Sequence, residues 1–378
     1  MTRRERLMAT LRGETVDRSP VSFYEISGVD QTPDNPDLFN IYSHPSWRPL
    51  LQLAREKTDL ILMRGVGFQP LSPDPLAELT REQTVLSDEG SQLTTRTIAV
   101  AGHTLVTRSR RDPDVNTVWT VEPLLKNVQD LKIFLASPAP GPDGPPDVSE
   151  ITNAEGTLGD SGIVMIDSPD PLCLAASLFS MEEYLVIAMT EQRLFRQLLD
   201  RFAATLLPRT EAAAQAAPGH LWRIYGPEYA SPPYLPPALF REYVCEYVKP
   251  MVASIQRHGG YARIHCHGKL RAILDDIVGM GAVGLDPVEP PPQGDVELDY
   301  VRKTYGQKLV LFGNLEASDI ENLPTDRFAE KIRRALAEGP DRGGSRFVLM
   351  PSACPYGRHL PALALRNYEK MIELAGAG

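Results

Sequence analysis

The sequence has few cysteines and no long apolar run. Its 378 residues include only four cysteines, at positions 173, 245, 266 and 354. Because their spacing is wide and irregular, a disulfide framework is excluded as the basis of the fold. We therefore expect reduced thiols and a cytoplasmic location.

Positive charge is also scarce, since the formal net charge is −10. This surplus of acid excludes duplex nucleic acid and anionic membrane surfaces as expected partners. No stretch approaches the roughly 18 apolar residues of a membrane span, and the beginning, Met-Thr-Arg-Arg-Glu-Arg, lacks the apolar core of a secretory signal. A composition of 42% hydrophobic and 23% charged residues is typical of a globular domain.

Short apolar runs recur along the chain, and segments with helical periodicity separate most of them. The eight runs cover residues 20–26, 59–64, 162–167, 221–226, 261–265, 282–286, 308–314 and 346–351. Helical periodicity is clearest over residues 181–206, 237–257, 270–280 and 325–338. Near-continuous apolar strands that alternate with helices are typical of a closed parallel barrel. The pattern predicts an α/β fold, a single (β/α)8 barrel domain over residues 1–378.

The alternation is interrupted between about residues 66 and 160. Within this insertion, residues 90–122 alternate between apolar and polar types, which predicts a small antiparallel sheet. Residues 137–147 are rich in proline and glycine and indicate a linker. A helical extension over residues 2–12 ends at Gly13, and residues 361–375 are expected to form a terminal helix.

Two histidines stand one residue apart at the end of the fifth apolar run, in Arg263-Ile-His-Cys-His-Gly. Residues i and i+2 of a strand point to the same face, so His265 and His267 should project side by side. Such a pair has the spacing that a tetrahedral metal ion needs from two nitrogen ligands, but it can also be two satisfied polar groups. The same alternation sends Cys266 outward, toward the helical layer.

Cys354 follows the last apolar run and lies between Pro351 and Pro355, which places it in a loop. A free cysteine is commonly a small buried hydrophobe. However, active sites of barrels lie at the carboxyl ends of the strands, so Cys354 and the two histidines should share one mouth. Two imidazoles and a thiolate leave a fourth position open, which is the pattern of catalytic zinc.

Other polar residues are predicted at the same strand ends. We expect Glu25 and Glu228 to act as a fourth ligand or general base, and Arg64 to hold a substrate carboxylate. The remaining candidates for substrate contacts are Tyr225, Asp167, Asn314, Glu316 and Glu289, with Asp286 close by. Glu289 and Glu316 are also candidates for the exchangeable ligand.

With these pieces placed, the chain resembles the uroporphyrinogen decarboxylase superfamily, in particular its zinc- and cobalamin-dependent methyltransferase-like branch. The likeness rests on segments spread over almost the whole length: Arg4–Leu11 with the following Val16-Asp-Arg-Ser-Pro-Val, Trp119–Leu131, Tyr225–Met251, His265–Gly268, the Tyr305–Asn314 strand and the late cysteine. The resemblance implies zinc held by His265 and Cys354, methyl transfer, and a corrinoid carried by a partner protein. Whether the chain is a monomer or a homodimer stays open.

The chain departs from the family pattern at one ligand. The position of the family's first zinc cysteine falls on His267, so a neutral imidazole replaces a thiolate and raises the charge of the site by one. The metal should then be a stronger Lewis acid and a poorer match for soft thiol chemistry. The arginine-rich stretch of the decarboxylase itself has no counterpart near Ser22–Gly28, where Glu25 stands instead.

The leading interpretation is thus a metal-dependent enzyme that transfers a methyl or other group, in which zinc activates a thiol, hydroxyl or water on a small-molecule substrate. One alternative is a metal-free carboxy-lyase of the uroporphyrinogen decarboxylase type. A second is a metal-dependent hydrolase, although such enzymes carry their His-x-His pair on the first strand. A third is a barrel without catalysis that binds a corrinoid or another small molecule.

Overall fold

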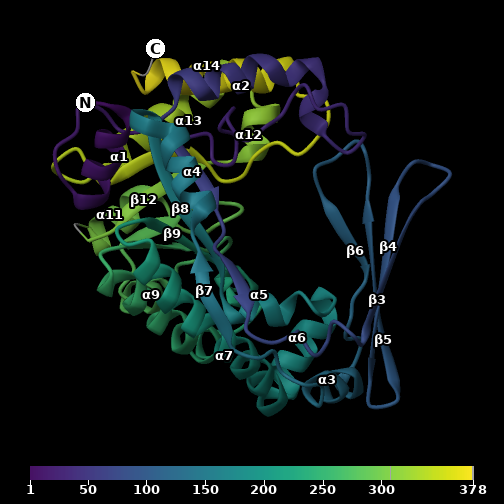
Figure 1. The fold of residues 1–378 in the computed structure, drawn as a ribbon. Coiled ribbons are helices and arrows are strands. Elements are labelled where there is room, and N and C mark those ends of the chain that lie inside the picture. The colour runs from purple at the N-terminus through teal and green to yellow at the C-terminus, as the bar shows by residue number, and fades with distance from the viewer. Residues whose placement is uncertain (307, 377–378) are drawn as a thin grey trace.

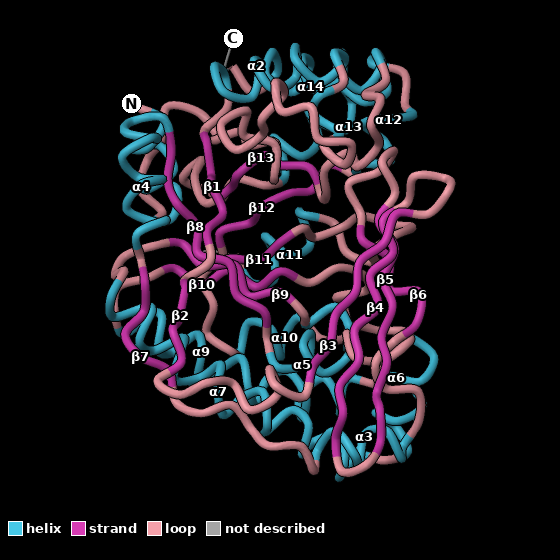
Figure 2. Tube along the Cα trace, turned by 45° about the vertical axis from the view of Figure 1, so that its right-hand side comes forward, coloured by secondary structure: helices cyan, strands magenta, loops and turns pink. Residues whose placement is uncertain are grey.

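A curved parallel sheet with helices packed on its outer face forms the body of the protein (Figures 1 and 2). The computed structural model describes residues 1–306 and 308–376. The sheet has seven parallel strands in the order β1 (Leu60–Arg64), β8 (Gly162–Pro169), β9 (Leu221–Tyr225), β10 (Tyr261–His265), β11 (Gly284–Asp286), β12 (Val310–Leu315) and β13 (Phe347–Pro351). These strands confirm seven of the eight that the sequence predicts.

The first predicted strand, residues 20–26, is reduced to a single bridge. Val21 pairs in parallel with Leu349 of β13, and its carbonyl accepts a hydrogen bond of 2.7 Å from the Asp59 N–H. The segment therefore lies between β13 and β1, but it does not continue as a strand because Tyr24 has a φ of 59°. The prediction of eight full strands is wrong at this position, and the structure has a seven-stranded curved sheet with one bridging segment.

The helices largely occupy the segments where the sequence predicts them. Their bounds are α1 (Arg3–Arg12), α2 (Arg48–Lys57), α3 (Val128–Leu135), α4 (Ser149–Leu158), α5 (Pro171–Ala176), α6 (Met181–Thr190), α7 (Gln192–Ala216), α8 (Pro237–Phe240), α9 (Glu246–Arg257), α10 (Leu274–Gly279), α11 (Leu298–Tyr305), α12 (Ala317–Asn322), α13 (Thr325–Glu338) and α14 (Ala362–Leu374). Residues 181–206, expected as one helix, are divided at Glu191, which leaves the helical region with a ψ of 42°. A π-helical turn at Arg241–Cys245 separates α8 from α9. None of the helices in the described ranges is long and apolar enough to cross a membrane.

Two small antiparallel sheets lie between β1 and β8 in the chain. One has the order β3 (Thr80–Leu86), β4 (Gln92–Val100), β5 (His103–Arg111) and β6 (Val118–Glu122), and it stands beside the body of the protein (Figure 1). The other pairs β2 (Gly67–Pro70) with β7 (Asp143–Asp147). Strand β7 lies inside the predicted linker of residues 137–147. Its two prolines are tolerated because a strand of a two-stranded sheet always has one unpaired edge.

Two apolar clusters lie on opposite faces of the parallel sheet. The larger joins the outer face to the helices, and Cys266 is fully buried in it, as the alternation along β10 predicts. The smaller fills the inside of the curved sheet with residues such as Ile61, Met165 and Phe312. Leu7 and Leu11 of α1 complete it at the end where the strands begin. Apolar side chains fill this interior at the beginning of the strands, and the polar groups on the inner face lie nearer the opposite, carboxyl end.

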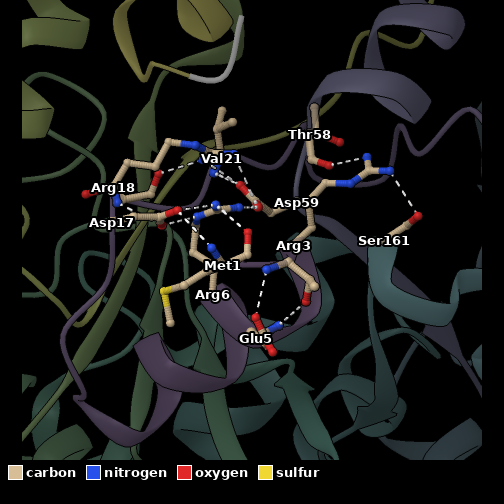
Figure 3. A network of polar contacts seen from close by, with 12 residues as sticks. Met1, Arg3, Glu5, Arg6, Asp17, Arg18, Val21, Thr58, Asp59 and Ser161 are labelled. Carbon is tan, nitrogen blue, oxygen red and sulfur yellow. Dashed lines mark hydrogen bonds and ion pairs between the residues drawn. The ribbon is translucent and has the colours of Figure 1, made fainter.

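A charged network fixes α1 to the beginning of the sheet (Figure 3). Thr2 and Glu5 form a capping box at the start of the helix. Arg6, which is 6% exposed, donates a hydrogen bond of 2.7 Å to the fully buried Asp59 and a pair of 2.6 Å bonds to Asp17. Arg18 also binds Asp59, at 2.8 Å. One buried carboxylate thereby joins α1, the bridging segment and β1.

We predict that Arg6→Ala lowers the free energy of unfolding by about 3 kcal/mol, because it leaves a buried carboxylate with one cation instead of two. The measurement is urea denaturation of the variant and the parent. Arg4→Ala is the matched control, since Arg4 lies on the same helix and its nearest carboxylate, on Glu155, is 3.7 Å away at the surface. The control should change stability by less than about 1 kcal/mol. Equal effects of the two substitutions would contradict the role given to Asp59.

Candidate functional site

A cavity of about 260 Å³ opens at the carboxyl ends of the parallel strands. It is lined by Tyr24, Glu25, Arg223, Tyr225, Glu228, His265, His267, Ser352, Ala353 and Cys354. The three predicted metal ligands thus line one cavity, together with three other residues that the sequence singles out. They come from β9, β10 and the segments that follow the bridge and β13, although they are far apart in the chain.

His265 is held by a carboxylate from the neighbouring strand. It ends β10 and lies opposite Asp286 in the parallel register. Its Nδ1–H donates to Oδ2 of Asp286 at 2.7 Å, and Arg263 forms an ion pair of 2.7 Å with Oδ1 of the same carboxylate. Complete burial alone would raise the pKa of Asp286, but Arg263 and His265 outweigh it and lower the pKa. Asp286 therefore stays ionised and fixes the tautomer of His265.

His267 has an equivalent partner in Glu289. Its Nδ1–H donates to Oε1 of Glu289 at 2.7 Å, and Oε2 accepts a bond of 2.8 Å from the Gly268 N–H. Burial works against a charged ring, but the hydrogen bond to Glu289 prevails and raises the pKa of His267. The sharp turn that brings the Gly268 amide to Glu289 uses a φ of 94°, which glycine adopts easily.

The two imidazoles are neighbours at an angle. Their ring centroids are 4.6 Å apart and the ring planes are inclined by 87°. Since both Nδ1 atoms are bound to carboxylates, Nε2 is the nitrogen that each ring can offer to the cavity. Among the described residues, neither Nε2 atom has a hydrogen-bond partner. A carboxylate bound to the far nitrogen is the usual way in which proteins orient metal-binding histidines.

Cys354 lies in the loop that follows β13, where its thiol donates to Oε2 of Glu25 at 3.5 Å. Burial, and then the negative charge of Glu25, raise the pKa of this thiol. The thiol is therefore protonated in this arrangement, and Glu25 is the group placed to take its proton.

The donor set fits a zinc ion by its chemistry: two oriented imidazoles, a thiol and a carboxylate that can accept the thiol proton. Within residues 1–306 and 308–376, no three His, Cys, Asp or Glu side chains already converge as a ligand group. Cys354 contacts Glu25 instead of the histidines, so metal binding requires the thiol to exchange that contact for the ion.

Arg223 and Tyr24 belong to the cavity but were missed from the sequence. Arg223 binds Asp167 through two hydrogen bonds, of 2.6 and 2.9 Å, and its Nη1 donates to the hydroxyl of Tyr24. Nη1 also lies 3.6 Å from Oε1 of Glu25. The sequence carries one signal for Arg223, which is an arginine in the middle of an apolar run. In the structure, Arg223 of β9 is the register partner of Arg263 in β10. Tyr24 gave no signal, because its left-handed backbone cannot be read from the sequence.

Several predicted residues lie elsewhere. Arg64 does not line the cavity, and it binds Asp30 through bonds of 2.7 and 3.1 Å. Asp167 serves as the partner of Arg223. Asn314 and Glu316 line a separate cavity of about 100 Å³ beside α13.

A larger cavity of about 350 Å³ adjoins the first, because Glu228 and His267 line both. Glu289 also lines it, together with Tyr229, Tyr234, Met181 and the cis-linked Pro232 and Pro233. This neighbouring cavity leaves open space next to His267.

Comparisons with known proteins identify the family and the fold. The sequence profile of the uroporphyrinogen decarboxylase (URO-D) family matches residues 164–376, more than half of the chain. The chain belongs to the URO-D family. The fold is similar to that of a solved structure, a methyltransferase from Methanosarcina mazei, with a TM-score of 0.59 and 17% identity, over 100% of this chain and 98% of that one. No curated protein matches the sequence. The predicted family is therefore confirmed, and at this identity the structural likeness concerns the fold.

Glu316 provides a test of the electrostatics beside the site. It is 8% exposed, its Oε1 has no partner among the described residues, and burial followed by the charge of Glu289 raises its pKa to about 7. Between about pH 4.3, the ordinary value for a glutamate, and about pH 7, the folded protein keeps a proton that the unfolded chain releases. Its stability should therefore fall as the pH rises through this window.

We predict that Glu316→Gln removes this loss. The variant should match the parent near pH 4 and exceed it by about 3 kcal/mol near pH 8, since a shift of one pKa unit corresponds to about 1.4 kcal/mol. Urea denaturation of both proteins at the two pH values measures the difference. Parallel stability curves for parent and variant would show that Glu316 ionises normally.

Proposed function

We propose that the chain is a zinc-dependent enzyme of the URO-D family that transfers a methyl or related group, with the metal held by His265, His267 and Cys354. The observation that carries the proposal is the pair of imidazoles whose Nδ1 atoms are bound to Asp286 and Glu289. The two pairs leave Nε2 of each ring available to the cavity that Cys354 also lines. The fold of a methyltransferase over the full length supports the type of reaction.

When bound, zinc would supply Lewis acidity that lowers the pKa of a thiol, hydroxyl or water. The residues of the chain accept protons and set the charge of the cavity. Glu25 accepts the proton of Cys354 at Oε2, and Glu228 stands between the two cavities, where it can accept a proton from the substrate. Arg223, and not Arg64, is the cation at the cavity. Since Asp167 neutralises it, the site suits a small substrate with little negative charge, and a corrinoid protein is the proposed partner in methyl transfer.

We expect protein purified without chelator or affinity metal to contain about one zinc per chain. His265→Ala and Cys354→Ala should each lose most of the affinity, because each removes one of three protein ligands. Elemental analysis and competition with a chromogenic chelator measure content and affinity. Cys266→Ala is the matched control, since Cys266 is the neighbouring buried thiol on the outer face and should keep the metal. A Cys354→Ala protein that holds zinc as tightly as the parent would falsify the ligand assignment.

The reaction type is tested by incubating the zinc-loaded protein with a methylated corrinoid protein and a thiol. Transfer of the methyl group to the thiol supports the proposal, whereas hydrolysis of an ester or amide without methyl transfer favours a hydrolase.

A separate prediction concerns uroporphyrinogen. Its many carboxylates should be repelled by Glu25 and Glu228 within the roughly 8–10 Å over which charges act at physiological ionic strength. We therefore expect no decarboxylation approaching the usual enzymatic range of about 1 per second or more. An anaerobic assay of coproporphyrinogen formation measures this, and turnover in that range would replace methyl transfer with the carboxy-lyase alternative.

A further inference from the structure

The loop that carries Cys354 is joined to the inserted antiparallel sheet. The carbonyl of Tyr356 accepts a hydrogen bond of 2.7 Å from the Asn116 N–H, and the Arg358 N–H donates to the Asp114 carbonyl at 2.7 Å. Val115 and Gly357 form an isolated antiparallel bridge between these two bonds. The connection between β5 and β6 therefore lies beside residues 356–358 like a short extra strand.

The side chain of Arg358 extends this junction to a third segment. Its Nε donates to the Pro113 carbonyl at 2.9 Å, its Nη1 donates to Oγ of Ser43 at 3.2 Å, and its Nη2 donates to the Leu38 carbonyl. The Arg358 carbonyl in turn accepts a bond of 3.0 Å from the indole N–H of Trp47, which is fully buried. One arginine thus holds together the insertion, the region after the first bridge, and the loop of Cys354.

The candidate ligand itself lies in a loop. Residues 352–361 form no helix or strand apart from the bridge at Gly357, and the thiol of Cys354 packs against the larger apolar cluster and donates one hydrogen bond, to Glu25. By contrast, His265 ends a strand and has a buried carboxylate partner. Ligand atoms must be held within about 0.5 Å of a productive geometry for tight binding. On the side before Cys354, the Ser352 N–H donates to the Leu315 carbonyl at 2.7 Å, which ties the loop to the parallel sheet. On the other side, the position of Cys354 depends on the contacts that follow it in the chain.

We propose that Arg358, together with residues 113–116 of the insertion, is a clamp that positions Cys354 at the mouth of the cavity. Arg358 does not line the cavity, so it is a positioning residue and not a catalytic one. The insertion then has a role in the site, because it braces the loop of one candidate ligand from outside the parallel sheet. The contacts described above carry the inference that Arg358 positions the thiol. The inference that this positioning affects metal binding rests on the proposed function.

The test compares Arg358→Ala with the parent in two measurements. In metal-free protein, the rate at which iodoacetamide alkylates Cys354, followed by mass spectrometry of its peptide, should rise at least about tenfold because local opening exposes the thiol. In the zinc titration, the dissociation constant should rise about 10- to 100-fold, the effect typical of lost support around a ligand.

Arg201→Ala is the matched control. Arg201 also binds two backbone carbonyls of the insertion, those of Ser137 and Pro138, at 2.9 and 2.7 Å, but it is remote from the Cys354 loop in its contacts. It should destabilise the protein without changing either measurement more than about twofold. If Arg201→Ala raises the alkylation of Cys354 as much as Arg358→Ala does, the effect is general loosening and the clamp is refuted.

A second variant tests the clamp if the Arg358→Ala protein does not fold. Asn116→Pro leaves Arg358 in place but removes the N–H that donates to the Tyr356 carbonyl, together with the Asn116 side chain, and it should also raise the alkylation rate. A folded variant of either kind with parental alkylation overturns the clamp. If the parent binds no zinc while alkylation still responds as expected, the clamp stands and the proposed function fails.

Discussion

The buried carboxylate of Asp286 is the group on which the arrangement of the candidate site depends. It ends β11, it is completely buried, and it faces both the guanidinium of Arg263 and Nδ1 of His265. An ionised group in that position is stable only with both partners, since an unpaired buried charge costs several kcal/mol. Asp286 thereby fixes the ring of His265, and the parallel register of β10 and β11 places the two residues directly opposite each other.

The division of the protein into an apolar interior and a polar mouth follows from the same sheet. On the inner face, positions near the beginning of the strands carry residues such as Ile61 and Ile163, whereas positions near the end carry Asp167, Arg223 and His265. At the beginning, the interior is closed by α1, and Arg6 and Arg18 are tied there to Asp59. The stability of the fold and the chemistry of the site therefore depend on separate charged networks at opposite ends of the sheet, so one can be altered without the other.

Much of this architecture could be predicted because it is encoded locally. Seven apolar runs became strands, and alternation along β10 placed His265 inward and Cys266 outward. The failures have a common cause in contacts between distant residues. Tyr24 adopts a positive φ that ends the first run early, and Arg64 finds Asp30 rather than the cavity. The backbone conformation of Tyr24 and the partner of Arg64 depend on which distant residues the folded chain brings near. A local pattern of apolar and polar residues does not specify those contacts.

The histidine at position 267 can be understood through its partner. The resemblance to the methyltransferase-like branch leads one to expect a thiolate there, and a neutral imidazole alone would leave the metal with one more positive charge. Glu289 offsets this difference, because burial would raise its pKa, yet the hydrogen bond to His267 lowers it and keeps the carboxylate ionised. A neutral imidazole together with its carboxylate carries the same net charge as a cysteine thiolate. The negative charge, however, lies on Glu289 behind the ring and not on the atom that would bind the metal. If zinc is held as proposed, the harder nitrogen donor would leave the overall charge of the site nearly unchanged and would make sulfur less strongly preferred in the open position than it is beside a second thiolate.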